Sequence, residues 1–421
     1  MVSEFDQNLE KYVDVILKVG INLQKGQRLL ITPHGGFNAS LIDIAPFIKL
    51  IAKKAYQLGA RFVEVLWNDL QLHLIRLQHA PHDSFEEFPI WRRDAYLEFI
   101  QNADAGLSIM ASDPNIFSDQ DPELMTTIIN TRSKHLKPVS VLLNQKKATN
   151  WSVFTVPIDG WAKKIFPDLP SDKGLAKLWD EIFNICRIKQ KDPISAWNKH
   201  INHLIARSNY LNKKQYTSLE LRAPGTDLKI GLPEGHIWKG GKSTSQKEID
   251  IVGNIPTEEV YTLPHKDMTE GTVKMTKPLN YRGFLIEDIK ISFSKGKIVD
   301  ITASKGKKFL DKTVKTDGGA SQLGEIALVP HSSPISQSNI LFYNGLIDEN
   351  ASCHIALGFA YRSSLKKGKD MSDEEFMAAG GNVSLIHIDF MIGSGKMDVD
   401  GINKDGEVEP IMRKGEWAFE V

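Results

Sequence analysis

The first half of the chain alternates between two hydrophobic patterns. Apolar residues recur at helical spacing in residues 5–19, 41–58 and 85–101. Short apolar runs follow at residues 28–33, 61–67, 106–110 and 139–143. Because short apolar strands that alternate with helices are typical of a parallel sheet covered on both faces, this pattern predicts a doubly wound α/β domain.

The second half has a different texture, and a helix separates it from the first. Asp192 is a good N-cap and Pro193 suits the first helical position, so a helix should begin there. Short alternating runs follow at residues 218–221, 227–230, 288–293 and 297–301. Their alternation predicts antiparallel strands with a hairpin loop at 294–297. We expect an α/β domain over 1–210 and a β-rich α+β domain over 211–421.

Length and charge restrict the class of protein. A chain of 421 residues is long enough for two domains. Lys and Arg together number 52, as do Asp and Glu, so no overall field favours nucleic acid or an anionic membrane as a partner. The N-terminus lacks a basic segment with a following apolar stretch, and no window approaches roughly 18 apolar residues. We therefore expect a cytoplasmic protein without nucleic-acid or membrane partners.

Several familiar motifs are absent or incomplete. Only Cys186 and Cys353 occur, which argues against a disulfide framework and a cysteine-rich zinc site, although Cys353 could be a thiol ligand instead of a buried small residue. No G-x-G-x-x-G follows an expected strand, which disfavours a dinucleotide. His200 and His203 could be metal ligands, but we expect them at polar positions on a helix surface. The histidines of the first half should lie at the surface or at helix ends, namely His34, His73, His79, His82 and His135.

The candidate chemistry lies in the last 170 residues, where acids and imidazoles stand in apolar segments. His387 and Asp389 belong to an apolar run of strand character, so their side chains should share one face. Burying both requires a partner, which is either an ion or the local His–Asp pair itself. Glu325 stands in another apolar run, where the alternative is an exposed carboxylate at a strand edge.

Further donors come from two other segments. Glu349 and His354 stand where a polar stretch turns apolar. Glu258 and Glu259 are neighbours on an extended segment, so at most one of them should face a shared site. Carboxylate oxygens and imidazole nitrogens are what a pair of Zn²⁺, Co²⁺ or Mn²⁺ ions needs. The sequence therefore predicts a two-metal hydrolase, and the absence of H-E-x-x-H excludes the single-zinc protease pattern.

The same segments resemble a known family. Residues 254–264, 271–273, 277–281, 324–325, 344–358 and 387–389 match in order the M29 metallopeptidases, the aminopeptidase T and aminopeptidase S group. The resemblance implies a broad-specificity aminopeptidase with two divalent metals, an α/β N-terminal domain, a C-terminal catalytic domain and a homodimer that encloses the active sites. The metal ligands that it implies are Glu259, Glu325, Glu349, His354, His387 and Asp389.

The expected reaction is release of N-terminal residues from peptides with a free amino end. Two ions can activate a water molecule, polarise the scissile carbonyl and hold the α-amine. Glu258 is the nearest candidate for a general base, and Tyr361 could donate a hydrogen bond to the oxyanion, as an alternative to a core tyrosine. Two other classes stay open: another dinuclear-metal hydrolase, either an amidohydrolase or a phosphoesterase, and a non-catalytic ligand-binding protein.

Overall fold

The computed structural model describes residues 3–36, 39–281 and 284–421, which fold into two compact units. The first unit comprises Met1–Lys199 and Lys242–Pro256, and the second comprises His200–Gly241 and Thr257–Val421. The change from one to the other falls inside the helix α8 (Pro193–Lys214), which Asp192 caps by accepting a hydrogen bond from the Ser195 amide. The single boundary expected near residue 210 stays a prediction, and the structure adds a short later segment to the first unit.

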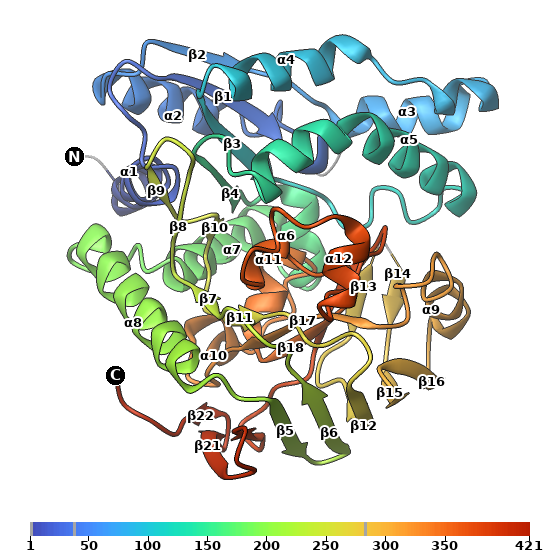
Figure 1. Ribbon diagram of the computed structural model, residues 1–421. Coiled ribbons are helices and arrows are strands. Elements are labelled where there is room, and N and C mark those ends of the chain that lie inside the picture. Colours follow the sequence, from blue (N-terminus) through green and yellow to red (C-terminus); the bar gives the residue numbers. More distant parts are fainter. Residues whose placement is uncertain (1–2, 37–38, 282–283) are drawn as a thin grey trace. The chain divides into compact units, whose positions relative to one another are not determined.

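The first unit contains a five-stranded sheet with the order β10-β4-β3-β1-β2, in which all pairs are parallel (Figure 1). Its strands are β1 (Arg28–Pro33), β2 (Phe62–Val65), β3 (Ala105–Met110), β4 (Trp151–Thr155) and β10 (Asn254–Ile255). The order runs to one side from β1 to β2 and then back past β1 to β3. Since crossovers are right-handed, this reversal places connecting helices on both faces, as a doubly wound fold requires.

In the described part of this unit, seven α-helices precede α8. They are α1 (Glu4–Val15), α2 (Ala45–Gln57), α3 (Leu70–His79), α4 (Ile90–Gln101), α5 (Pro122–Ser140), α6 (Asp159–Ile165) and α7 (Ser171–Ile185). The strand expected at 139–143 is wrong, because α5 continues through Ser140 and a π-helical turn covers Val141–Gln145. A short apolar run does not distinguish strand from buried helix, and the fourth strand of the sheet is instead β4.

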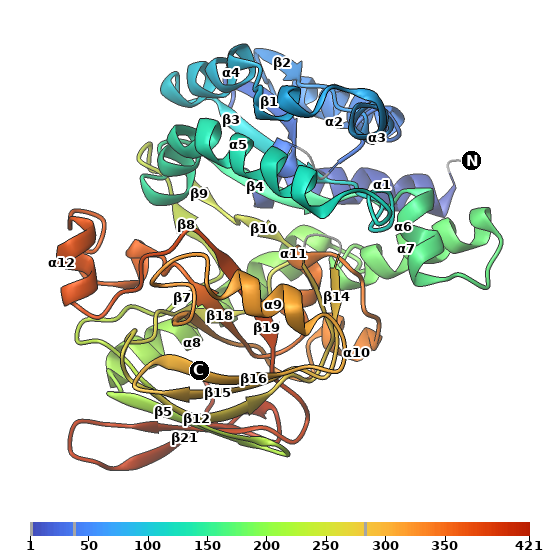
Figure 2. The same cartoon turned by 90° about the vertical axis from the view of Figure 1, so that its right-hand side faces the viewer.

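The second unit contains two larger antiparallel sheets. One has eight strands in the order β16-β15-β12-β6-β5-β20-β21-β22, and its strands form one layer in Figure 2. These strands are β5 (Ser218–Ala223), β6 (Thr226–Gly231), β12 (Thr269–Lys274), β15 (Lys290–Ser294), β16 (Lys297–Thr302), β20 (Asp398–Ile402), β21 (Val408–Arg413) and β22 (Glu416–Trp417). The hairpin expected at 294–297 is confirmed, since Ser294 pairs with Lys297.

The other sheet has five strands in the order β19-β18-β17-β11-β7. Its strands are β7 (Lys239–Gly240), β11 (Val260–Thr262), β17 (Leu323–Leu328), β18 (His354–Gly358) and β19 (His387–Met391). Short helices complete the unit: α9 (Lys307–Thr313), α10 (Pro334–Ser338), α11 (Gly345–Asp348) and α12 (Asp373–Ala378). A two-stranded sheet pairs β13 (Leu279–Tyr281) with β14 (Phe284–Ile286), and in the first unit β8 (Ser243–Thr244) pairs with β9 (Asp250–Ile251).

The core of the second unit lies against one face of this five-stranded sheet. Val260, Ile326, Ile355 and Ile388 are at most 2% exposed and belong to one apolar cluster with residues of the eight-stranded sheet. Burial of this face fixes the register, because a shift by one residue would turn the apolar set outward. Over the described residues, no helix has both the length and the hydropathy needed to cross a bilayer.

Candidate metal centre

The opposite face of the same sheet gathers the expected acids and imidazoles. In an antiparallel sheet, residues directly opposite each other point to the same side. Glu325 stands opposite Ala356, which stands opposite Asp389, and His354 stands opposite Ala327 on the same face. His387 lies two residues before Asp389 on β19, so it shares that face. The sheet therefore places metal-ligand donors from three neighbouring strands on one side, which we call the donor face.

A β-bulge at Gly324 sets the position of Glu325. The pairing of β17 with β18 shifts between Leu323 and Glu325, which leaves Gly324 as the extra residue. A Cβ atom at position 324 would lie 2.3 Å from the carbonyl oxygens of Gly358 and Phe359, so only glycine fits this close approach. The bulge lets Leu323 stay in the core while Glu325 turns to the donor face. This explains the Gly-Glu pair in the sequence.

Five of the expected ligands converge on this face. His354 Nε2 lies 3.2 Å from a Glu259 oxygen and 3.6 Å from a Glu325 oxygen. His387 Nε2 lies 3.7 Å from the other Glu325 oxygen and 3.4 Å from Asp389. One donor atom from each of Glu259, Glu325 and His354 lies within 4.8 Å of the others, and the same holds for Glu325, His387 and Asp389. The two groups share Glu325, so they form adjoining sites.

Main-chain carbonyls fix the orientation of both imidazoles. Nδ1 of His354 donates to the Ser352 oxygen at 3.1 Å, and Nδ1 of His387 donates to the Phe359 oxygen at 2.8 Å. A proton held on Nδ1 leaves Nε2 as the atom that faces the carboxylates, which is the arrangement found around metal-ligating histidines. Burial works against the charged form of His387, but Asp389 and Glu325 outweigh it and raise its pKa to about 9.

Burial and the nearby carboxylates raise the pKa values of two acids at this site. Burial raises the pKa of Glu325, with the adjacent Glu259 and Asp389 adding to the effect against the hydrogen bond from His354. The pKa of Glu349 is raised well above its usual value by burial and by repulsion from Asp389 and Glu259. Several carboxylates thus crowd a site with only two imidazoles. Hard oxygen and imidazole donors with an excess of negative charge suit divalent cations.

Glu258 has different surroundings from its neighbour Glu259. Its carboxylate lies 3.6 Å from His200 Nε2, and this nitrogen also donates to the Thr257 carbonyl at 2.8 Å. Glu258 is only 2% exposed and is a member of neither of the two groups found in the described residues. His200 was expected on the helix surface, but its side chain is 13% exposed and packs against the segment that carries Glu259. The sequence offered no signal for this contact.

Asn350 is a second residue that sequence reasoning missed. Its side chain is fully buried, its Oδ1 accepts a hydrogen bond from the Glu258 amide at 2.8 Å, and its Nδ2 donates to a Glu349 oxygen at 3.4 Å. One amide therefore connects the backbone beside Glu259 to the carboxylate of Glu349. This geometry allows Asn350 to hold two parts of the donor set in register.

Aromatic rings line the donor face next to His387. The ring centroids of Phe359 and Tyr361 lie 4.6 Å and 5.3 Å from the imidazole, and Tyr261 follows at 6.0 Å from Tyr361. Burial and the nearby Glu325 raise the pKa of both tyrosines, so their hydroxyls stay protonated and can donate. Cys353 instead points into the core and burial raises its pKa to about 11, which makes it a packed residue rather than a thiolate ligand.

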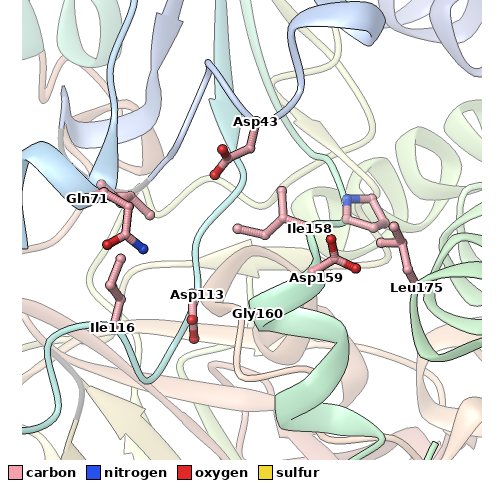
Figure 3. A pocket seen from close by; sticks show the side chains of 10 residues that line it. Asp43, Gln71, Asp113, Ile116, Ile158, Asp159, Gly160 and Leu175 are labelled. Atoms are coloured by element: carbon pink, nitrogen blue, oxygen red, sulfur yellow. The ribbon is translucent and has the colours of Figure 1, made fainter. Parts of the chain in front are cut away.

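A separate pocket of about 370 Å³ lies in the first unit, beyond the carboxyl ends of the parallel strands (Figure 3). Three aspartates line it, but Asp113 accepts a hydrogen bond from the Asn115 amide and Asp159 accepts one from the Ser171 hydroxyl. None of the described residues that line it carries an imidazole or a thiol. This pocket therefore lacks the mixed donor set of the second unit.

Comparisons with known proteins agree with this assignment. Residues 5–417 match the thermophilic metalloprotease family M29. The chain is 44% identical to Aminopeptidase 2 of Geobacillus stearothermophilus, covering 100% of both chains, and 42% identical to Aminopeptidase AmpS of Bacillus subtilis, covering 99% of this chain and 100% of that one. The structure of AmpT from Thermus thermophilus superposes with a TM-score of 0.92 at 37% identity, covering 99% of this chain and 100% of that one.

These findings confirm the resemblance that the C-terminal motifs indicated, together with the α/β and β-rich fold classes of the two halves. They also confirm the expected enzyme class, a hydrolase of peptide bonds that depends on divalent metal ions. The chain belongs to the M29 family of thermophilic metalloproteases.

Proposed function

We propose that the protein is an aminopeptidase that removes N-terminal residues from peptides with two divalent cations at the donor face of the second unit. The observation that carries this proposal is the pair of adjoining donor groups that share Glu325. A shared carboxylate is what allows two ions to lie about 3.5–4 Å apart. The names of the similar proteins support the exopeptidase activity, since Aminopeptidase 2 and AmpS resemble this chain along its whole length.

The residues present fit ions of the Zn²⁺, Co²⁺ or Mn²⁺ type. Glu259 and His354 would contribute to one ion and His387 and Asp389 to the other, and Glu325 belongs to both donor groups. Glu349 interacts electrostatically with four of these side chains and would complete the set. When bound, such ions supply an activated water, a polarised scissile carbonyl and a ligand position for the free α-amine.

The chain's own residues supply orientation and proton handling. The main-chain oxygens of Ser352 and Phe359 keep the imidazoles aimed at the cluster. Tyr361 lies beside His387 with a protonated hydroxyl, so it would donate a hydrogen bond to the oxygen of the reacting carbonyl. Glu258 would accept the proton of the attacking water only after its carboxylate turns from His200 toward the cluster. Comparison of Glu258→Gln with His200→Gln tests this role, because a proton acceptor should be the costlier loss.

The experiment for the proposal removes the metal and varies the amino end of the substrate. Chelation should abolish hydrolysis of an amino-acid anilide, and Co²⁺, Zn²⁺ or Mn²⁺ should restore it, with two ions bound per chain. The same peptide carrying an N-acetyl group should be a poor substrate, because the cap removes the amine that the site holds. Phosphoester hydrolysis without peptidase activity, or protein that binds no metal under any condition, would contradict the proposal.

The expected homodimer and the cytoplasmic location also remain proposals. The resemblance to the M29 metallopeptidases supports the homodimer. Sedimentation of the metal-loaded enzyme would give its mass in solution, and a monomer that has full activity would contradict a dimeric requirement.

A further inference from the structure

The donor face continues past the cluster to the edge of the sheet. Tyr261 on β11 stands opposite Ala327 on one side and opposite Lys239 of β7 on the other. Because directly opposite residues share a face, the Lys239 side chain lies on the same side as Tyr261, His354 and the other donors. The side chains of His387, Tyr361 and Tyr261 follow one another along this face. Lys239 lies at the end of this series.

Lys239 differs from other lysines of the second unit in its surroundings. Lys214, Lys229 and Lys266 each form an ion pair with a carboxylate. Lys239 is half-buried, yet no described carboxylate lies within 4 Å of its Nζ. Burial and the nearby Lys369 lower its pKa. An ammonium that is partly withdrawn from water and lies near a second cation is stabilised by a counter-ion, so this position suits an anion from outside the chain.

The segment after Tyr361 brings a second cation to the same place. Ile237 donates its amide to the Ser364 oxygen, and Lys366 donates its amide to the Gly235 oxygen, so residues 364–366 run beside residues 235–237. Lys369 follows this stretch and interacts electrostatically with Lys239. Two positively charged lysines thus lie at one end of the donor face, whereas the acid cluster on the same face carries negative charge.

The spacing of the strands sets the distance from this end to the cluster. Lys239 and His354 are separated by three strand spacings of about 4.8 Å, or roughly 14 Å between backbones. A lysine side chain and two or three residues of extended peptide at about 3.3 Å each can bridge such a gap.

We propose that Lys239 binds the C-terminal carboxylate of a di- or tripeptide whose amino end lies at the cluster. This inference rests on the proposed aminopeptidase function and names its preferred substrates: short peptides with a free C-terminus. The carboxylate supplies the missing counter-ion, and a charged hydrogen bond to it is stronger than one to an amide. Longer or amidated peptides lack a carboxylate at this distance and lose that bond.

The test uses the metal-loaded enzyme and the tripeptide Leu-Gly-Gly, with either a free or an amidated C-terminus. The wild type should favour the free acid, and Lys239→Met should lower the ratio of the two kcat/KM values by about tenfold or more, mainly through KM. Lys239→Arg keeps the charge and should retain most of the ratio. Lys290→Met changes an exposed lysine on β15 of the other sheet and should leave both rates unchanged.

The outcomes distinguish failure of the Lys239 subsite from failure of the proposed aminopeptidase function. If Lys239→Met lowers both rates equally or neither, the carboxylate subsite is wrong, while hydrolysis of the amide still upholds the aminopeptidase. If the metal-loaded wild type cleaves neither peptide, the proposed function fails and the subsite fails with it. Loss of the ratio in Lys239→Met with its retention in Lys239→Arg supports the subsite.

Discussion

The two five-stranded sheets of this protein use the same number of strands for different purposes. In β1 of the first unit, Leu29, Leu30 and Ile31 are consecutive and at most 3% exposed, so this strand is apolar on both faces. In β19 of the second unit, His387 and Asp389 alternate with Ile388 and Phe390 of the core. A strand that is apolar on both faces contributes to the stability of the fold, whereas a strand with one apolar face can carry functional side chains on its other face.

The histidines show the same difference. Burial, together with Arg132, Arg92 and Arg76, lowers the pKa of His73 in the first unit to about 4. Acids raise the pKa of His387 in the second unit to about 9. One imidazole is thus kept neutral among cations and the other is held among carboxylates.

The largest expected effect comes from the carboxylate shared by the two donor groups. Glu325→Gln keeps the shape of the side chain but removes the charge that both groups use. Because loss of outer partners of a metal site already costs about 10–100-fold, loss of a carboxylate that belongs to both donor groups should lower kcat/KM by more than about a hundredfold. Metal content and peptidase rate are the measurements, with circular dichroism to follow the fold.

A matched surface change gives the control for this variant. Glu374→Gln alters an exposed acid in the first turn of α12 and should leave metal content and turnover unchanged. Near-normal turnover in Glu325→Gln would show that Glu325 is not an essential metal ligand.

The next effect tests the amide that joins two parts of the donor face. Asn350→Ser removes the hydrogen bonds to the Glu258 amide and to Glu349. We expect a loss of about 10–100-fold in metal affinity and in kcat/KM, as for other residues that orient ligands. Asn403→Ser breaks comparable side-chain bonds in a surface turn and serves as the control. Weakened stability with unchanged metal affinity would assign Asn350 a purely structural role.

Local patterns predicted those features that depend on one strand at a time. Alternation alone placed His387 and Asp389 on one face and separated Glu258 from Glu259. The convergence of Glu259 with His354 depends on which strands pair and in what register, and no local pattern contains that information. The resemblance to the M29 family supplied this set instead. The contacts of His200 and Asn350 were missed because a polar residue on a helix or in a turn looks the same whether it faces solvent or a buried segment.

A smaller effect concerns the first unit and pH. The folded state holds His73 at a pKa of about 4, below its ordinary value of 6.5, so the unfolded chain binds a proton first as the pH falls. Stability is therefore complete above pH 6.5 and decreases toward pH 4. The loss is at most about 3 kcal/mol, reduced to the order of 2 kcal/mol by the partial exposure of the ring.

Denaturant unfolding between pH 4 and pH 7 checks this expectation. His73→Gln retains a donor for Asn68, which now bonds the imidazole at 2.8 Å, but has no proton to gain. Its stability relative to the wild type should therefore rise as the pH falls. His79→Gln at the exposed end of α3 should follow the wild type. Parallel pH curves for His73→Gln and the wild type would exclude His73 as the cause.

The smallest expected effect comes from the apolar face of β17, the strand that carries Glu325 on its other face. Ile326 follows Glu325 on β17 but points into the core, where it is fully buried. Ile326→Val removes one methyl group and should lower the free energy of unfolding by about 0.5–1.5 kcal/mol. Because the backbone and the donor face stay in place, kcat/KM per folded molecule should be unchanged. Glu325→Gln should then change activity at constant stability. Ile326→Val should change stability at constant activity. A loss of metal affinity in Ile326→Val would instead show that packing on the apolar face sets the spacing of the ligands.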